Sequence, residues 1–575
     1  MRILFILLAI AFPTGYMHLH SPTADIQSVL AKRKRTLISC GVDASTFDPA
    51  ANVVPLLPGW GAYRMPITAI KKTDSAYIYF QQGINLYYGF HIIEALASFY
   101  KSTGFDSSFA MGYWGVALSY GPNINDDHYT ESPKALAAAE KASALSGNLS
   151  APEKALIGAM LTRYTVDTTL SRLQLNQAYA DAMGKIYRQF PNNQDIAALY
   201  ADALMQQHPW DLYDLKGQPK TWTPPIVTTL EAILKINPSH PGACHYYIHA
   251  VEASDHPERA LAVSDRLPGL MPGVAHVVHM PAHIYIRTGN YNMGWKVDTQ
   301  AVQQYKNYLA RYPAVADNTP LYLIHNLHMQ AACAAMEGRY ADAMQAAIDT
   351  RQSFDSSWMS FPDFMGTYIQ YIYMTPLLTQ LRFGRWDDIL KEKPAPSTYI
   401  YADVLTHFCR GIAFARTQRP EDAEKELAAL HNDTSNQQLL APAPNYSNPG
   451  INGTRVAERI LTGVIAESRG QLPQAITAFE QAVQFEDGMI YDEPKDWQQP
   501  ARQFLGNVLL KATQYAAAER TFREDLQQNP KNGWSYTGLA TALKKQGKVK
   551  QAALAQSQAQ KALTRSDIKV PAAVL

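Results

Sequence analysis

The sequence predicts an all-α protein, a solenoid in which antiparallel helix pairs stack side by side into a superhelix. Three observations lead to this prediction. Small and large apolar residues recur in the same order, so that Ala518 and Ala552 hold equivalent places 34 residues apart. The apolar positions follow the period of a helix, and no competing pattern alternates as a half-buried strand does. Proline-rich segments such as residues 222–227 and 440–450 separate the apolar stretches and are expected to be loops.

The clearest copies of the repeated motif lie near the end of the chain. Gly463 and Phe479 in one copy are matched by Gly506 and Phe522 in the next, and a further copy surrounds Gly547. These spacings are typical of the tetratricopeptide repeat (TPR). Small residues where two helices cross let the pair approach closely, and large apolar residues fill the remaining space. The chain is therefore predicted to be a TPR-like α-solenoid.

The repeats change character along the chain, which suggests three regions. Residues 75–350 carry irregular TPR-like repeats that are rich in histidine, tryptophan and asparagine. Residues 351–450 carry degenerate helical repeats, and residues 451–575 carry regular TPR repeats with few histidines. The irregular region is where a repeat protein would be adapted to a specific task, so it is the one expected to carry the candidate site.

The first 24 residues have the pattern of a signal peptide. One arginine precedes an apolar run over residues 3–12, which is followed by Pro13 and small residues. This run is too short to span a membrane, and no other stretch approaches the roughly 18 uninterrupted apolar residues of a membrane helix. We expect residues 1–24 to hold the signal peptide and the start of the mature chain. The protein is then exported to the periplasm or the cell exterior, without a membrane span.

The charge balance argues against nucleic acid or an anionic membrane as a partner. The 575 residues include 51 Lys and Arg against 50 Asp and Glu, for a net charge of +1. The four cysteines are widely spaced and form no CxxC pair, so they predict no thiolate metal site. The expected ligand is a small molecule or a peptide.

Histidines gather in one part of the irregular region. Half of the 16 histidines fall between residues 245 and 328. The pair His245 and His249 in "HYYIHAVEASDHPERAL" returns 34 residues later as His279 and His283 in "HVVHMPAHIYIRTGNY". Residues three, four or seven apart share one helical face, so each helix offers a one-sided stripe of imidazoles. Three consecutive repeat units contribute, with His245, His249 and Glu252 in the first, His276, His279 and His283 in the second, and His325 and His328 in the third.

Three interpretations of these stripes remain open. Neighbouring helices pack ~8–10 Å apart, so imidazoles from two stripes can meet across a gap that fits an ion or a small substrate. Neutral imidazoles with a carboxylate suit zinc, copper or iron, and two sets of three histidines could hold two ions. Alternatively, the histidines donate hydrogen bonds to a peptide or an anion in a groove without metal. In the third interpretation they are structural residues, bonded to tyrosines and backbone carbonyls.

The metal interpretation gives each residue a role. The ligands are His245, His249, His279 and His283. Further ligands or acid–base groups for catalysis are Glu252, His276, His325 and His328. A metal-bound imidazole usually needs a hydrogen-bond partner for its other ring nitrogen, and the candidates are Tyr246, Tyr285 and Asn326.

Pro281 interrupts the second stripe between His279 and His283, where it would remove a backbone hydrogen bond. Either a helix begins at Pro281, or a helix is kinked there and the kink opens the groove. The sequence does not distinguish the two arrangements.

Five segments of the chain resemble one known family. They are "YWGVALSYGPNIN", "PWDLYDLKGQP", "HPGACHYYIHAVEASDHPERAL", "PGVAHVVHMPAHIYIRTGNY" and "LIHNLHMQAACAAMEGRY". In this order they are similar to a group of bacterial, often exported TPR proteins with a histidine-rich core of HxxxH and HMPxH motifs, over residues 75–390. The resemblance implies that the histidines line the concave surface, and it brings no agreed reaction. It also implies Phe-Asn-His in the first repeat, where this chain has Phe90 and His91. His91 could act from one place earlier.

Together these observations predict a metal-dependent enzyme of the TPR class, whose concave, histidine-lined pocket acts on a small or peptidic substrate. The alternative is a non-catalytic TPR scaffold that binds a partner peptide in the groove and another protein through its C-terminal repeats. The enzyme requires the histidines to converge in one pocket. The scaffold would let them spread along the groove at the repeat spacing.

Overall fold

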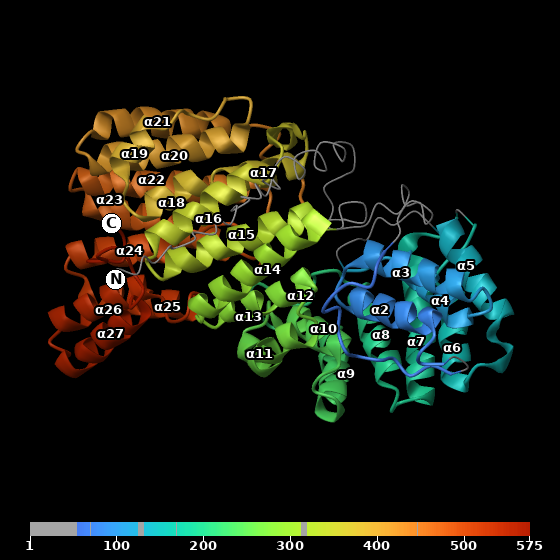
Figure 1. Ribbon diagram of the computed structural model, residues 1–575. Coiled ribbons are helices and arrows are strands. Elements are labelled where there is room, and N and C mark those ends of the chain that lie inside the picture. The colour runs from blue at the N-terminus through green and yellow to red at the C-terminus, as the bar shows by residue number, and fades with distance from the viewer. Residues whose placement is uncertain (1–53, 69–70, 125–131, 168, 312–318, 445–446) are drawn as a thin grey trace, which may run out of the picture.

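The computed structural model describes residues 54–68, 71–124, 132–167, 169–311, 319–444 and 447–575. The predicted signal peptide within residues 1–24 lies outside these ranges. Within them the chain forms helices and no strand, apart from an isolated bridge between Tyr213 and Pro219. None of these helices is both long enough and apolar enough to cross a membrane. The prediction of an all-α, TPR-like solenoid is confirmed (Figure 1).

In Figure 1 the helices α2 to α9 gather at one end of the molecule, the histidine-rich helices lie in the middle, and the C-terminal helices form the other end. The first set comprises α2 (Ser75–Tyr88), α3 (Ile92–Phe105), α4 (Ala110–Ser119), α5 (Ser132–Ala144), α6 (Ala151–Met160), α7 (Arg172–Gln189), α8 (Gln194–Met205) and α9 (Thr223–Ile236). The histidine-rich set comprises α10 (Pro241–Val251), α11 (Leu261–Leu270), α12 (Ala275–His279), α13 (Pro281–Arg287), α14 (Tyr291–Arg311), α15 (Thr319–Met336) and α16 (Tyr340–Gln352).

The C-terminal part continues the array. It comprises α17 (Phe364–Tyr373), α18 (Thr375–Arg382), α19 (Trp386–Lys391), α20 (Ile400–Arg416), α21 (Pro420–Asp433), α22 (Gly450–Ser468), α23 (Leu472–Asp487), α24 (Ala501–Lys511), α25 (Tyr515–Gln528), α26 (Gly533–Lys545) and α27 (Val549–Ala562). Short 3₁₀ turns lie at Ser146–Asn148, Pro257–Ala260 and Ser356–Ser360.

The glycines of the repeat motif allow paired helices to touch. A Cβ atom on Gly463 would lie 2.5 Å from the ring of Phe479, and one on Gly506 would lie 2.5 Å from the ring of Phe522. Both distances are shorter than a carbon–carbon contact allows, so the space beside each phenylalanine is open only to glycine. The spacing of small and large residues in the sequence therefore results from the close packing of paired helices.

The hydrophobic core is divided into two main clusters. One runs from Val54 to Ile284 and the other from Ile324 to Ala573. This division falls inside the irregular region. It reports where packing between helices changes, so the predicted boundaries near residues 350 and 450, which follow the regularity of the repeats, stay a prediction. The histidine-rich helices lie at this seam, since α10 and α13 contribute to the first cluster and α15 to the second.

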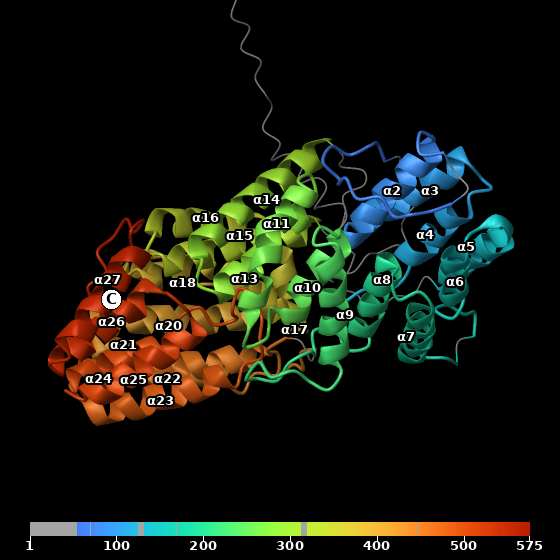
Figure 2. The same ribbon diagram turned by 90° about the horizontal axis from the view of Figure 1, so that it is seen from below.

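The C-terminal repeats fold back onto the histidine-rich units. Trp534, at the start of α26, is buried and donates a hydrogen bond from Nε1 to the carbonyl oxygen of Ala335, at 3.0 Å. The backbone N–H of Tyr340 donates to Asp567 at 2.6 Å. In Figure 2 the red helices α26 and α27 accordingly lie next to α16. The last repeats of the chain therefore contact α15 and α16, where the second half of the solenoid begins.

Residues 488–500, which connect α23 to α24, are called the closing segment from here on. Trp497 is buried, and Gln499 donates from its side-chain amide to the carbonyl oxygen of Leu378, at 2.9 Å. Tyr491 packs against the guanidinium group of Arg287, 5.3 Å from its ring centroid. The closing segment therefore covers α13 and reaches the histidines.

Candidate metal centre

Two prolines mark the starts of helices that carry the histidines. Pro241 occupies the first turn of α10, as predicted, and the ring of His240 caps the helix by accepting from the backbone N–H of Ala243. Pro281 begins α13, which answers the question that the sequence left open. Met280, between α12 and α13, keeps helical dihedral angles of −45° and −37°. Residues on both sides of Pro281 therefore stay on one face.

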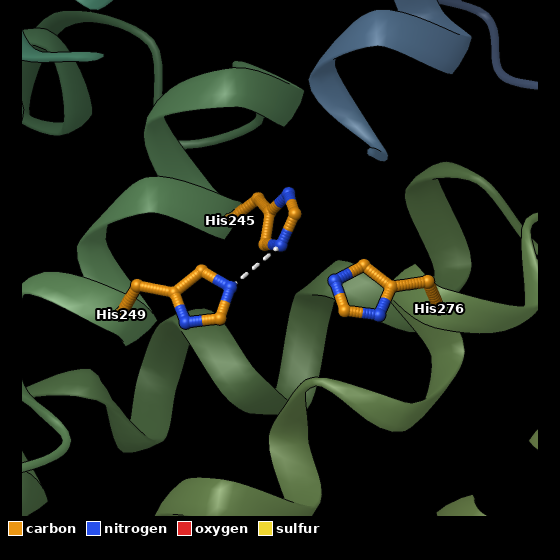
Figure 3. A group of neighbouring side chains, drawn as sticks. All are labelled: His245, His249 and His276. Atoms are coloured by element: carbon orange, nitrogen blue, oxygen red, sulfur yellow. Dashed lines mark hydrogen bonds between the residues drawn. The ribbon is translucent and has the colours of Figure 1, made fainter. Parts of the chain in front are cut away.

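The first histidine triad consists of His245 and His249 on α10 and His276 on α12. The Nε2 atoms of His245 and His249 lie 3.1 Å apart, and one ligand atom from each of the three imidazoles lies within 4.8 Å of the others. Figure 3 shows a ring nitrogen of His276 directed towards the gap between the other two rings. Both ring nitrogens of His276 are buried without a hydrogen-bond partner. Three nitrogen donors thus converge on one point.

The second histidine triad consists of His279 and His283, on either side of Pro281, and His325 on α15. The Nε2 atom of His279 lies 2.8 Å from that of His283 and 3.1 Å from that of His325. The ring centroids of His249 and His283 are 6.0 Å apart, so the two triads are neighbours. His325 is the part-exposed member, whereas the other five histidines are buried.

The outer nitrogens of the first triad face hydrogen-bond acceptors. The Nδ1 atom of His245 lies 2.6 Å from the carbonyl oxygen of Tyr88, which can only accept. The Nδ1 atom of His249 lies 3.1 Å from Oε1 of Glu252. Each Nδ1 therefore carries the proton, and each Nε2 of the neutral ring presents a lone pair to the gap.

The second triad is held in a similar way by carboxylates. The Nδ1 atom of His279 lies 2.6 Å from Oδ1 of Asp298 on α14. The Nδ1 atom of His283 lies 2.8 Å from Oε2 of Glu252 and 2.7 Å from Oε2 of Glu493, which belongs to the closing segment. Glu252 thus contacts one histidine from each triad. An imidazole backed by a carboxylate is the usual arrangement of a metal-binding histidine.

Burial controls the protonation of the triads. Removal from water lowers the pKa of His245, His276, His279 and His325 well below the ordinary value. Burial also lowers the pKa of His283, but the charges of Glu252 and Glu493 outweigh it and raise that pKa. Burial lowers the pKa of His249 as well. Five of the six imidazoles are accordingly neutral at neutral pH, the form in which histidine binds metal.

Aromatic rings enclose the first triad. The ring of Phe90 lies 4.4 Å from that of His245, and the ring of Tyr322 lies 4.5 Å from that of His276. Phe90 has a positive φ of 56° and precedes His91, whose Nδ1 lies 3.6 Å from Oε1 of Glu94. His91 is not grouped with either triad. Aromatic rings thus form part of the wall of the first triad.

His328 and the predicted partner residues lie apart from the triads. The Nε2 atom of His328 accepts from the side-chain amide of Gln498 at 2.7 Å. Tyr285 donates to Asp265, while the hydroxyl of Tyr246 and the side-chain amide of Asn326 are buried without a partner. The prediction that Tyr246, Tyr285 and Asn326 hold the outer nitrogens is thus wrong. Tyr88, Glu252, Asp298 and Glu493 do so instead.

A small cavity of about 60 Å³ adjoins the second triad and is lined in part by Arg287, Tyr491, Glu493 and Gln498. It has room for water and for little else. The closing segment lines one side of this cavity and helices α13 and α15 line the other.

Comparisons with known proteins found only distant structural likeness. No family model matches the chain, and no curated protein matches it. Similar solved structures include the human IFIT1 dimer with m7Gppp-AAAA, with 12% identity and a TM-score of 0.32 over 86% of this chain and 95% of that one. Another is the APC/C hetero-tetramer Cut9-Hcn1, with 12% identity and a TM-score of 0.27 over 86% and 76% of the two chains. At these values the likeness carries no argument about the site.

Proposed function

We propose that this chain is a metal-dependent enzyme in which the two histidine triads bind two transition-metal ions next to a site for a small or peptidic substrate. Copper, zinc and iron are the ions that suit donor sets made of imidazole alone. Three protein donors leave further coordination positions for water or substrate, as in catalytic metal sites. An ion held in this way supplies Lewis-acid chemistry, or electron transfer if it is copper or iron.

The observation that carries this proposal is the convergence of lone pairs. His245 and His249 both carry the proton on Nδ1, so that two Nε2 lone pairs face each other at 3.1 Å. Such a contact is unfavourable unless a cation lies between the two atoms. A proton could serve, but burial disfavours the charged imidazole. A metal ion satisfies both atoms and the unpartnered His276 together.

The charge of the site also favours a bound cation. Glu252, Asp298 and Glu493 are buried, and within the described residues none of them forms an ion pair with lysine or arginine. Glu252 and Glu493 share one charged partner, His283, whose pKa they raise, whereas Asp298 faces the neutral ring of His279. A buried carboxylate without a full counter-charge is costly. Burial indeed raises the pKa of Asp298 well above its ordinary value. A cation bound through His279 would favour the ionised form of this carboxyl.

The chain's own residues position the donors and exclude water. Asp298 fixes the ring of His279, and Glu252 joins the two triads through His249 and His283. His325 is at the part-exposed edge, which is where we place the approach of substrate. The scaffold alternative needed histidines spread along an open groove, and the convergence of six imidazoles, five of them buried, speaks against it.

Elemental analysis tests the proposal. Protein purified without a histidine tag is equilibrated with zinc, copper or iron salts and desalted, beside the double variant His245→Ala/His279→Ala. His256→Ala is the matched control, because that side chain is 66% exposed and lies outside both triads. We expect at least two ions per chain in the parent and the control, and their loss in the double variant.

Metal-loaded and metal-free protein are then compared in assays for oxidation and hydrolysis of small and peptidic substrates. Absence of metal from the parent, with an unchanged circular dichroism spectrum, rejects the proposal and makes a peptide pull-down the next experiment. We also propose, on the sequence of residues 1–24, that the protein works after export. Fractionation of the producing cells tests this second proposal.

A further inference from the structure

Three ligand atoms meet on the side of His283 that faces away from the second triad. The Nδ1 atom of His283 lies 2.8 Å from Oε2 of Glu252 and 2.7 Å from Oε2 of Glu493. All three atoms are buried, and none of them has a partner in hydrogen-bond geometry. One nitrogen and two oxygens are therefore close to one another without being bonded as a donor and its acceptors.

The opposite oxygen of each carboxylate is already held. Oε1 of Glu252 contacts His249, and Oε1 of Glu493 accepts from the hydroxyl of Tyr491. Both side chains are thus fixed so that their free Oε2 atoms face His283. A single N–H group cannot satisfy two carboxylate oxygens that it does not point at, and two buried carboxylates at one nitrogen repel each other. Glu252, His283 and Glu493 together form a buried group whose ligand atoms could hold a metal ion.

We propose that a third divalent ion binds between Glu252, Glu493 and His283, and that the imidazole of His283 bridges it to the ion of the second triad. The bridge rests on the proposed function, because Nε2 of His283 is a donor of that triad. When both ions bind, His283 gives up its ring proton to solvent and becomes an imidazolate. The two carboxylates and the imidazolate balance the added charge in part.

The donors indicate the kind of ion. Two carboxylate oxygens and one imidazole nitrogen form a harder set than three imidazoles, and suit zinc, manganese or ferrous iron rather than cuprous copper. Glu493 is the one ligand that comes from the closing segment. The third site therefore forms only when the C-terminal repeats are folded back onto α13, so that binding of this ion stabilises the closed arrangement.

Zinc stoichiometry tests the third site. Metal-free full-length protein is saturated with zinc, desalted and analysed for zinc per chain, beside Glu493→Gln. The matched control is Glu486→Gln, because Glu486 is a half-buried carboxylate at the end of α23 that accepts from the backbone N–H of Ala501 and does not contact His283. We expect three ions in the parent and the control, and two in Glu493→Gln.

Each other outcome overturns the third site in a recognisable way. Two ions in all three proteins would remove the third site and leave the proposed function standing. No zinc in the parent would remove both. Fewer than two ions in a folded Glu493→Gln protein would mean that Glu493 serves the triads and holds no ion of its own. If thermal melting shows that Glu493→Gln does not fold, the zinc content of the parent decides the question. Three ions per chain support the third site, and two ions per chain exclude it.

Discussion

Replacement of Asp298 by asparagine tests how the second triad is held. The carboxylate of Asp298 is fully buried, with 0% of its side chain exposed, and its Oδ1 lies 2.6 Å from Nδ1 of His279. Asparagine keeps the shape and an acceptor oxygen but removes the charge that makes the imidazole a stronger donor. Loss of such a supporting carboxylate typically weakens metal binding about 10- to 100-fold. Because this one is completely shielded from solvent, we expect the upper part of that range, about 2–2.8 kcal/mol.

The assay is competition for zinc between the protein and a chromophoric chelator, which gives the dissociation constant of each site that the chelator can empty. One site should weaken in Asp298→Asn, while the first triad keeps the affinity of the parent. Asp265→Asn is the control, because Asp265 accepts from Tyr285 and touches neither triad. If Asp298→Asn binds zinc as the parent does, whereas His279→Ala loses a site, then the carboxylate does not support the ligand and this reasoning is refuted.

Three further predictions concern stability. Burial lowers the pKa of His328 to about 3, below the ordinary 6.5, so the unfolded chain takes up the proton first and stability falls as the pH drops below about 6.5. Between pH 6.5 and 5.5, the free energy of unfolding of the parent should therefore fall by about 1 kcal/mol more than that of His328→Gln, as measured by urea unfolding. Equal decreases in the two proteins would contradict this prediction. Removal of metal by a chelator should lower the melting temperature by several degrees. An ion whose free concentration is a hundred times its dissociation constant stabilises the folded state by about 2.7 kcal/mol. An unchanged melting temperature would mean that no ion was bound. Gly506→Ala should cost about 1–3 kcal/mol because its Cβ would strike Phe522. Gly158→Ala, where a Cβ meets nothing within 4 Å, should cost nothing, and equal effects of the two glycine variants would exclude the clash as the cause.

The fold could be predicted because its pattern is local. Gly463 and Phe479, or Gly506 and Phe522, lie within one helix pair, so that their spacing reports the crossing directly. The histidine stripes could be predicted for a similar reason, since residues four apart share a face of one helix. The division of the core into two clusters could not be predicted from the sequence, because it depends on which helices pack together and not on how regular each repeat is.

The residues behind the histidines required the tertiary structure. Asp298 reaches His279 from α14, and Glu493 reaches His283 from a loop more than 200 residues further along the chain. Tyr88 contributes a backbone carbonyl, which carries no signature in a sequence. Tyr246 failed as a partner because adjacent residues of a helix point about 100° apart, so it faces away from the stripe that holds His245.

Diffraction from crystals of the metal-loaded protein, recorded at the absorption edge of the bound metal, tests the central claim most directly. The account predicts one anomalous peak among the ring nitrogens of His245, His249 and His276, and a second among those of His279, His283 and His325. Peaks confined to other groups, such as the half-buried Asp403, His407 and Asp433, would contradict the account. So would the absence of any peak at the two triads in crystals soaked with zinc and with copper.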